Sequence, residues 1–250
     1  MSDSQSVIIE HQQVAGADWS RQTFATFTTV GATLTGCRFD RARIQDAGLG
    51  AGAELSELIG CSFDGTSLRA LGGFTRFVNC TFRNVRVTKP APDYLEFVDC
   101  TFTGKLTGLH FWGAPLDAPG RYRRHATSLA RRGLPAPPPA VESLMLRPHN
   151  DVRGNDFSQA TLIDVNFRFG VDLTIQKLPS GPGYIYVPDA AAALPRAQAT
   201  LTDDRARAFL QSLLDREVAQ GQHQLWLRPA DFTRKGEVPA HIVAATEALR

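Results

Sequence analysis

Five arginines and a tyrosine gather within a dozen residues near the middle of the chain, with no aspartate or glutamate among them. Guanidinium groups donate forked hydrogen bonds that match phosphate and carboxylate oxygens. This cluster therefore suggests binding of nucleic acid or of an acidic protein partner, the alternative being a solvated helix with no binding role. The candidate partner-binding residues are Arg121, Tyr122, Arg123, Arg124, Arg131 and Arg132.

The cysteines are the next candidates for chemistry, because they recur at intervals of 24, 19 and 20 residues. None of them forms a C-x-x-C pair and the histidines follow no ligand spacing, so the sequence predicts no metal site. Thiols stay reduced in the cytoplasm, and a buried cysteine packs as a small hydrophobic side chain. We therefore expect a column of buried thiols formed by Cys37, Cys61, Cys80 and Cys100.

Carboxylates and histidines form no pattern that is typical of an active site. Asp40 and Asp64 directly follow phenylalanines, at places where the chain is expected to turn. Acid–base catalysis needs two groups that converge in a cleft, and the scattered histidines accompany no serine or cysteine in a nucleophile motif. We therefore expect that the protein is not an enzyme, with no catalytic residue and no cofactor.

The elements that must position these residues are set by a repeat. Each cysteine is followed two positions later by a phenylalanine, and the aligned blocks begin at Gly31, Leu55, Phe74 and Tyr94. A fifth block, from Gln159, carries Val165 in the cysteine position. Because four such blocks recur about every 20 residues, the chain is expected to fold as a stack of similar coils.

Within a block, large apolar side chains recur every fifth residue. This period differs from the 3.6 of a helix and the 2.0 of a strand, and it suits short extended pieces that turn a corner. The residue before each cysteine position is Gly36, Gly60, Asn79, Asp99 or Asp164, all types that tolerate turns. The predicted repeat core is Leu34, Cys37, Phe39, Leu58, Cys61, Phe63, Phe77, Cys80, Phe82, Phe97, Cys100, Phe102, Leu162 and Phe167.

The chain resembles the pentapeptide-repeat family, whose loose motif is A(D/N)LXX, in AGADWSRQTF, ATLTGCRFDRARIQDAGL, CSFDGTSLRA, the CTF blocks and NDFSQATLIDVNF. The resemblance covers about residues 15–112 and 154–173, a little under half of the chain. It implies a mainly β fold, a right-handed quadrilateral β-helix. Some family members protect type II topoisomerases from toxins or drugs by imitating duplex DNA.

The repeat region is expected to span residues 14–173, with a proline-rich basic insertion at 113–153. Removing about 45 residues from the 65 between Cys100 and Val165 would leave one normal step, so the solenoid is expected to resume in register. A short helix is predicted from about Arg121 to Gly133.

Residues 174–250 carry no repeat and are predicted to form a small α+β appendage that caps the solenoid or binds a partner. We expect strands at Tyr184–Val187 and His223–Arg228, a helix over Asp203–Gln220, and a last helix after Pro239.

The composition, 43% hydrophobic and 21% charged with a net charge of +2, is that of an ordinary globular protein. The N-terminal stretch 1–13 lacks the apolar run of a signal peptide, and no later run is long enough to span a bilayer. We therefore expect a cytoplasmic protein that does not bind membranes.

Three functions remain open. The first is a non-catalytic protein-interaction scaffold with an unidentified protein partner. The second, implied by the resemblance, is gyrase protection or self-resistance to a toxin or antibiotic by DNA mimicry. However, residues 16–110 contain nine acids against ten bases, whereas a mimic should be acidic. The third is binding of nucleic acid or an acidic partner through the basic insertion. The oligomeric state is open, with a dimer through the C-terminal region as one option.

Overall fold

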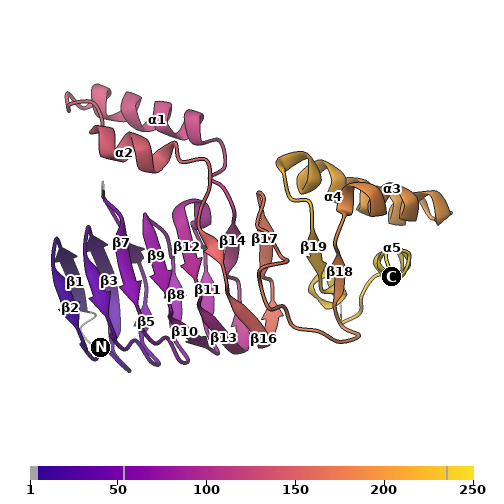
Figure 1. Cartoon of the computed structure of the whole chain (residues 1–250), viewed down its shortest axis with the longest axis horizontal. Helices are drawn as coiled ribbons and strands as arrows, with labels where there is room; N and C mark the ends of the chain where they lie inside the picture. The colour runs from indigo at the N-terminus through magenta and orange to yellow at the C-terminus, as the bar shows by residue number, and fades with distance from the viewer. Residues whose placement is uncertain (1–4, 53, 235) are drawn as a thin grey trace.

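The computed structural model describes residues 5–52, 54–234 and 236–250. They form a β-solenoid of about five turns, followed by a smaller unit of helices and a strand pair (Figure 1). The strands of the solenoid pair in parallel, each with the strand about one coil further along the chain. The mainly β class expected from the five-residue period is confirmed.

One sheet runs along the solenoid in the order β1–β3–β5–β8–β11–β13–β10, and β6 and β16 pair with β3 and β13. Its strands are β1 (Gln5–Glu10), β3 (Thr23–Val30), β5 (Arg43–Ile44), β6 (Ala47–Leu49), β8 (Ser67–Arg69), β10 (Thr81–Arg83), β11 (Arg86–Thr88), β13 (Thr101–Thr107) and β16 (Asp156–Ile163).

A second sheet has the order β15–β12–β9–β7–β4–β2, and β14 and β17 form a separate pair. The short 3-10 helix η1 (Pro92–Tyr94) leads into β12. The strands of these sheets are β2 (Gln13–Ala15), β4 (Thr33–Thr35), β7 (Ser56–Ile59), β9 (Thr75–Val78), β12 (Leu95–Val98), β14 (His110–Trp112), β15 (Val152–Arg153) and β17 (Asn166–Arg168).

The core is a stack of aromatic rings, since each coil places a phenylalanine over that of the previous coil. Ring centroids lie 4.9 Å apart between Phe39 and Phe63 and 4.8 Å between Phe63 and Phe82, with interplanar angles of 1° and 4°. The stack continues through Phe102 to Phe157 at 4.9 and 4.5 Å. The spacing of parallel strands brings the rings into offset-stacked contact, which stabilises each pair by about 0.5–1.5 kcal/mol beyond burial.

The cysteines line one side of this stack as free, buried thiols. Each Sγ donates to a backbone carbonyl of the preceding coil, as from Cys61 to Leu34 (3.4 Å) and from Cys80 to Leu58 (3.1 Å). All the residues predicted for the repeat core are buried. The small thiol thus fills the space beside the ring and satisfies its weak donor.

The corners before the cysteines adopt left-handed backbone conformations. The φ angles are +61° at Gly36, +60° at Gly60, +51° at Asn79 and +53° at Asp99. Glycine reaches this region without strain, and asparagine and aspartate tolerate it better than other residues. The restricted set of residue types at this position therefore has a backbone cause.

The fifth block does not continue the cysteine column, so the expectation for Val165 is wrong. Thr101 pairs with Asp156, and the Asn155 Oδ1 accepts a hydrogen bond from the backbone N–H of Cys100. Asn155 therefore stands next to Cys100, whereas Val165 lies two sides further around the coil. The five-residue period explains the error. Every side of a coil carries the same pattern of large and small residues, so an alignment that is off by two five-residue steps looks correct but places a residue two sides away.

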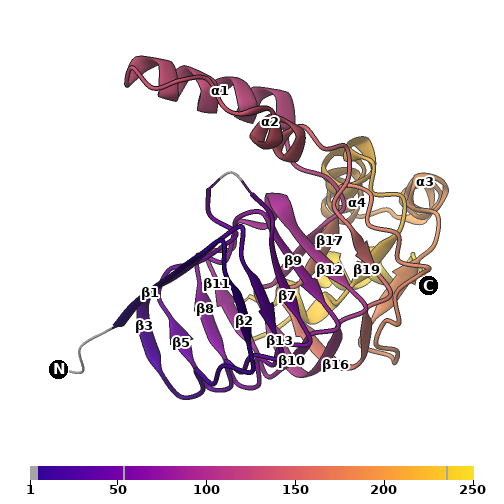
Figure 2. The same cartoon turned by 60° about the vertical axis from the view of Figure 1, so that its left-hand side comes forward.

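The chain leaves the solenoid after Gly113 and returns at Asn150, whose backbone N–H donates to the Gly113 carbonyl at 2.8 Å. The excursion carries helices α1 (Ala118–Arg131) and α2 (Pro139–Met145). The two helices form a hairpin that lies outside the stack of coils (Figure 2). On the far side of the excursion β15 pairs with β12 and β16 with β13, so the solenoid resumes with its parallel pairing intact.

The C-terminal unit contains an antiparallel pair, β18 (Ile185–Val187) and β19 (Leu225–Leu227), packed with helices. The helices are α3 (Ala190–Thr200), α4 (Asp204–Arg216), α5 (Ala240–Glu247) and the short η2 (Val218–Gln220) and η3 (Pro229–Phe232). Helix α3 is absent from the sequence-based expectations. Pro195 lies inside it, where proline is disfavoured, while the Asp189 side chain caps its first turn.

This unit covers the C-terminal end of the solenoid. The Trp226 ring meets Phe167 edge to face, and the Gln222 Oε1 accepts from the backbone N–H groups of Gly170 and Val171. The Gln222 side chain also donates to the Val171 carbonyl, at 3.0 Å. A glutamine amide thus makes the donor and acceptor contacts that a further strand would otherwise supply.

We expect the four thiols to be unreactive in the folded protein. The neighbouring thiol of Cys80, together with burial, raises the pKa of Cys61, and that of Cys100, together with burial, raises the pKa of Cys80. Because the thiolate is the reactive form, Ellman's reagent at mildly alkaline pH should modify none of the four until guanidinium exposes them all. A thiol that reacts rapidly without denaturant would contradict this packing.

Candidate partner-binding surface

Helix α1 carries the basic cluster and begins three residues earlier than the sequence predicted. Asp117 accepts a hydrogen bond from the backbone N–H of Gly120 at 3.1 Å, and a proline occupies the first turn. Both features favour a helix start, since the cap satisfies a free amide and proline needs no donor there. At the other end Gly133 adopts a left-handed φ of +67° and stops the helix.

Apolar contacts hold the hairpin against the solenoid. Val141 and Met145 of α2 are buried against Phe74, which belongs to the corner before β9. Tyr122 of α1 packs against the same cluster, as do Leu55, Tyr94 and Leu144. The start of α1 and helix α2 are thereby fixed to the coils, and α1 is mostly exposed from Arg123 onward.

Ion pairs reinforce this attachment. Arg121 on α1 lies 2.9 Å from the buried Asp93, and Arg147, which follows α2, lies 3.3 Å from the buried Glu96. Arg147 also donates to the Tyr94 carbonyl at 2.8 Å. Burial raises the pKa of Asp93, and the charge of Arg121 opposes that rise. The two arginines thus compensate carboxylates that would be costly to bury alone.

The predicted partner-binding residues are therefore divided along the length of α1, between its first turn and the exposed remainder. Arg121 and Tyr122 face the solenoid, and the remaining arginines, Arg123, Arg124, Arg131 and Arg132, are exposed. Arg124 contacts Asp117 at 3.1 Å in a solvent-exposed pair, which is a weak interaction.

The exposed side of α1 also carries Thr127 and Ser128, which the sequence interpretation did not include. They line a shallow depression of about 470 Å³ together with the exposed arginines. Residues three and four positions apart share one side of a helix, so the spacing of 123, 127 and 131 was the available signal. We call this surface, formed by Arg123, Arg124, Thr127, Ser128, Arg131 and Arg132, the basic face of α1.

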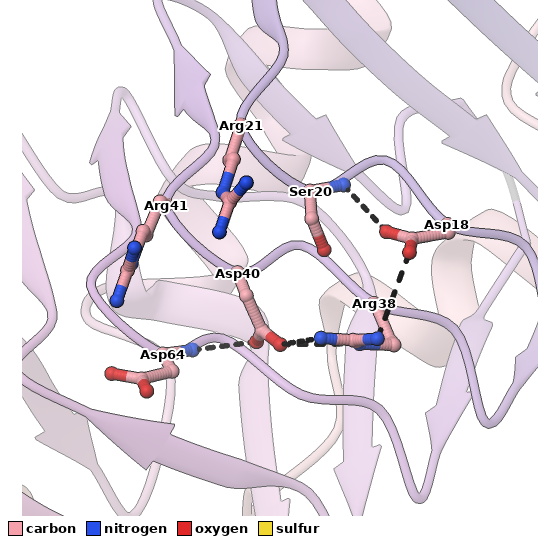
Figure 3. A pocket seen from close by; sticks show the side chains of 7 residues that line it. All are labelled: Asp18, Ser20, Arg21, Arg38, Asp40, Arg41 and Asp64. Atoms are coloured by element: carbon pink, nitrogen blue, oxygen red, sulfur yellow. Dashed lines mark hydrogen bonds and ion pairs between the residues drawn. The ribbon is translucent and has the colours of Figure 1, made fainter.

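A second polar surface lies at a corner of the first three coils (Figure 3). Arg38 lies between two acids, with its guanidinium 3.7 Å from Asp18 and 3.0 Å from Asp40. Asp40 also accepts from the backbone N–H of Asp64 at 2.9 Å. These contacts tie each coil to the next across an open depression of about 590 Å³.

Two carboxylates of this corner, those of Asp18 and Asp40, have lowered pKa values. Ser20, whose backbone N–H donates to Asp18 at 2.9 Å, lowers the pKa of Asp18. Burial works against ionisation at Asp40, yet hydrogen bonds from the backbone N–H of Asp64 and from the Arg38 guanidinium outweigh it and lower the pKa. A general acid would need a raised pKa, so these acids fit a role in joining the coils better than proton transfer.

A third depression, of about 350 Å³, lies between the last coil and α4. Glu217 and Asp231 line it, and each is already paired, Glu217 with Arg168 at 2.8 Å and Asp231 with Arg228. Burial raises the pKa of Glu217, against the charge of Arg168. The Glu217–Arg168 pair joins the C-terminal unit to the solenoid, and this structural role accounts for the position of Glu217.

Within the described ranges, no set of three or more histidine, cysteine, aspartate or glutamate side chains is arranged to hold a metal ion. None of the helices in that part of the chain combines the length and apolar character needed to cross a membrane. Neither a scan of models of known protein families nor a search of curated proteins finds a match to this chain.

The Asp93–Arg121 pair predicts an asymmetry between two substitutions. Arg121→Met leaves the buried Asp93 without its compensating charge and should lower the free energy of unfolding by about 3 kcal/mol, whereas Asp93→Asn should cost about 1 kcal/mol. The loss in Arg121→Met should shrink as the pH falls, because Asp93 takes up a proton more readily in the folded state than in the unfolded state. Urea denaturation at several pH values measures both effects.

The control is a double-mutant cycle. In the Asp93→Asn background, Arg121→Met should have little further effect at any pH. Equal costs for the two single variants, or a cost of Arg121→Met that does not change with pH, would contradict the compensating role of Arg121.

Proposed function

We propose that this chain is a non-catalytic binding protein of the pentapeptide-repeat class, in which the solenoid is a scaffold and the basic face of α1 meets an acidic partner. The five-residue period of the buried core and the parallel pairing of successive coils support the class. The observation that supports the binding role is a helix without acidic residues, fixed to the coils near its start and exposed along the rest of its length.

The chemistry of the basic face favours nucleic acid as the partner. It offers guanidinium and hydroxyl donors, which are the groups that usually contact phosphate oxygens. It presents no aromatic or large aliphatic side chain among its six residues, whereas such anchors dominate the energetics of protein–protein interfaces. The helix of 14 residues is about 21 Å long, enough to contact several phosphates of one strand.

Attachment to a rigid support helps such a surface to bind. A free basic segment would lose conformational entropy on binding, whereas α1 is already ordered by its contacts with Phe74 and Asp93. The coils thus hold α1 in a fixed position, and α1 supplies the positive charge.

DNA mimicry receives less support. The acids of the solenoid alternate with arginines along its length, as in the Asp18–Arg38–Asp40 group and in Arg76 between Glu57 and Glu96. A mimic of duplex DNA would need an uninterrupted acidic face.

Replacing Arg123, Arg124, Arg131 and Arg132 with alanine should abolish binding to nucleic acid, measured by fluorescence anisotropy with labelled single- and double-stranded DNA and RNA. If the four arginines each neutralise one phosphate of a DNA duplex, the affinity of the unmodified protein should fall about 100-fold between 50 and 200 mM salt. The variant should fold normally, because all four side chains are exposed.

A matched control removes the same amount of charge elsewhere. The exposed Arg43, Arg69, Arg86 and Arg205 lie outside the excursion, and their alanine variant should retain binding and its salt dependence. Equal loss in both variants would mean that net charge alone is responsible. Binding to an acidic protein in place of nucleic acid, or no binding at low salt, would reject the nucleic-acid partner.

A further inference from the structure

The N-terminal end of the solenoid is an open edge. Strands β1 and β2 each have a single neighbouring strand in the described residues, β3 and β4 respectively. Both lie at the same end of the molecule, opposite the C-terminal unit (Figure 1). An uncovered edge presents unpaired amides and carbonyls, which favour pairing with another strand.

The inward-facing side chains at this end are also incompletely covered. Val7, Val14, Ala17 and Trp19 pack on the core but remain partly exposed. Their neighbours one coil further, including Phe27 beside Val7 and Leu34 beside Val14, are fully buried. The first coil therefore has the side chains of an internal coil, and none of the residues that the structure describes forms a layer over them.

The opposite end cannot accept this edge. There Trp226 covers the aromatic stack, and the Gln222 and Gln224 side chains occupy backbone groups of residues 170–173. Head-to-tail stacking of copies, which would build a filament, is thus blocked by the C-terminal unit. Contact between two N-terminal ends remains available, and it closes after two copies.

The backbone of β1 is oriented for such a contact. The His11 N–H donates to the Val30 carbonyl of β3. Since amides alternate in direction along a strand, the odd-numbered residues of β1 bond to β3, and Ser6, Ile8 and Glu10 direct their amides to the open edge. Two copies facing each other about a two-fold axis would bring these edges together antiparallel.

We propose that two copies of this chain form a dimer through their N-terminal ends, with β1 pairing antiparallel to β1 of the second copy and Ile8 opposite Ile8. This register places Ile8 at the two-fold axis as a hydrogen-bonded pair, and it sets Val7 opposite Ile9 on the inner face. Ile8 is 64% exposed in the single chain, the highest exposure among its large hydrophobic side chains in the described residues. The pairing buries it against its own copy.

The proposal is independent of the basic face, although a dimer would carry two copies of α1. The test depends on Ile8 lying opposite Ile8 of the second copy. Ile8→Lys places two positive charges directly opposite each other and Ile8→Glu two negative charges, so each variant should be monomeric by sedimentation or light scattering. The unmodified chain should have twice the 27.3 kDa chain mass. An equimolar mixture of the two variants should restore the dimer, because opposite charges then face each other.

The control is Ile175→Lys, since Ile175 is 50% exposed and lies far from β1 in the chain. This variant should remain dimeric, and thermal denaturation should confirm that all three variants fold. A monomeric unmodified chain at micromolar concentration would overturn the proposal. So would a dimer that survives Ile8→Lys, or monomeric variants whose mixture fails to associate.

Discussion

In successive coils a phenylalanine ring lies face to face on the ring before it, at 4.5 to 4.9 Å from Phe39 through to Phe157. That distance equals the spacing of neighbouring parallel strands, so ring contact and backbone hydrogen bonding are satisfied together. A residue inserted within one side of a coil would disrupt the ring contact and the backbone hydrogen bonds together. The core therefore requires insertions to leave at a corner, and the excursion at Gly113 obeys this requirement.

The same constraint explains why a long excursion is tolerated. Each coil contacts mainly the coils on either side of it, so the chain can depart and return if the two ends of the gap remain adjacent. The Asn150–Gly113 hydrogen bond keeps them adjacent, and the entropy of closing the loop grows slowly with its length. The excursion then folds against the outside of the coils through its own apolar contacts and ion pairs.

The sequence predicted what the repeat controls and missed what long-range contacts control. The cysteine–phenylalanine spacing was enough to predict the solenoid and its buried residues, because a local period reports directly on inward-facing positions. It could not distinguish the sides of a coil, which is why Val165 was assigned to the column that Asn155 continues. The pairs of Arg121 with Asp93 and of Arg147 with Glu96 join residues distant in the chain and have no local signature. The sequence therefore could not tell that Arg121 contacts the coils while the other arginines of the cluster are exposed.

The two ends of the solenoid face the same problem of unpaired backbone groups and partly covered side chains. At the C-terminal end the chain solves it internally: Gln222 supplies both a donor and an acceptor, and Trp226 covers the last ring. The first coil has Trp19 as the last ring of the stack, 5.0 Å from Phe39, but no comparable cover among the described residues. The interior coils are equivalent, so the two ends differ only in how they are covered. The dimer proposed above uses this difference: it closes at the open end, while the C-terminal unit covers the other.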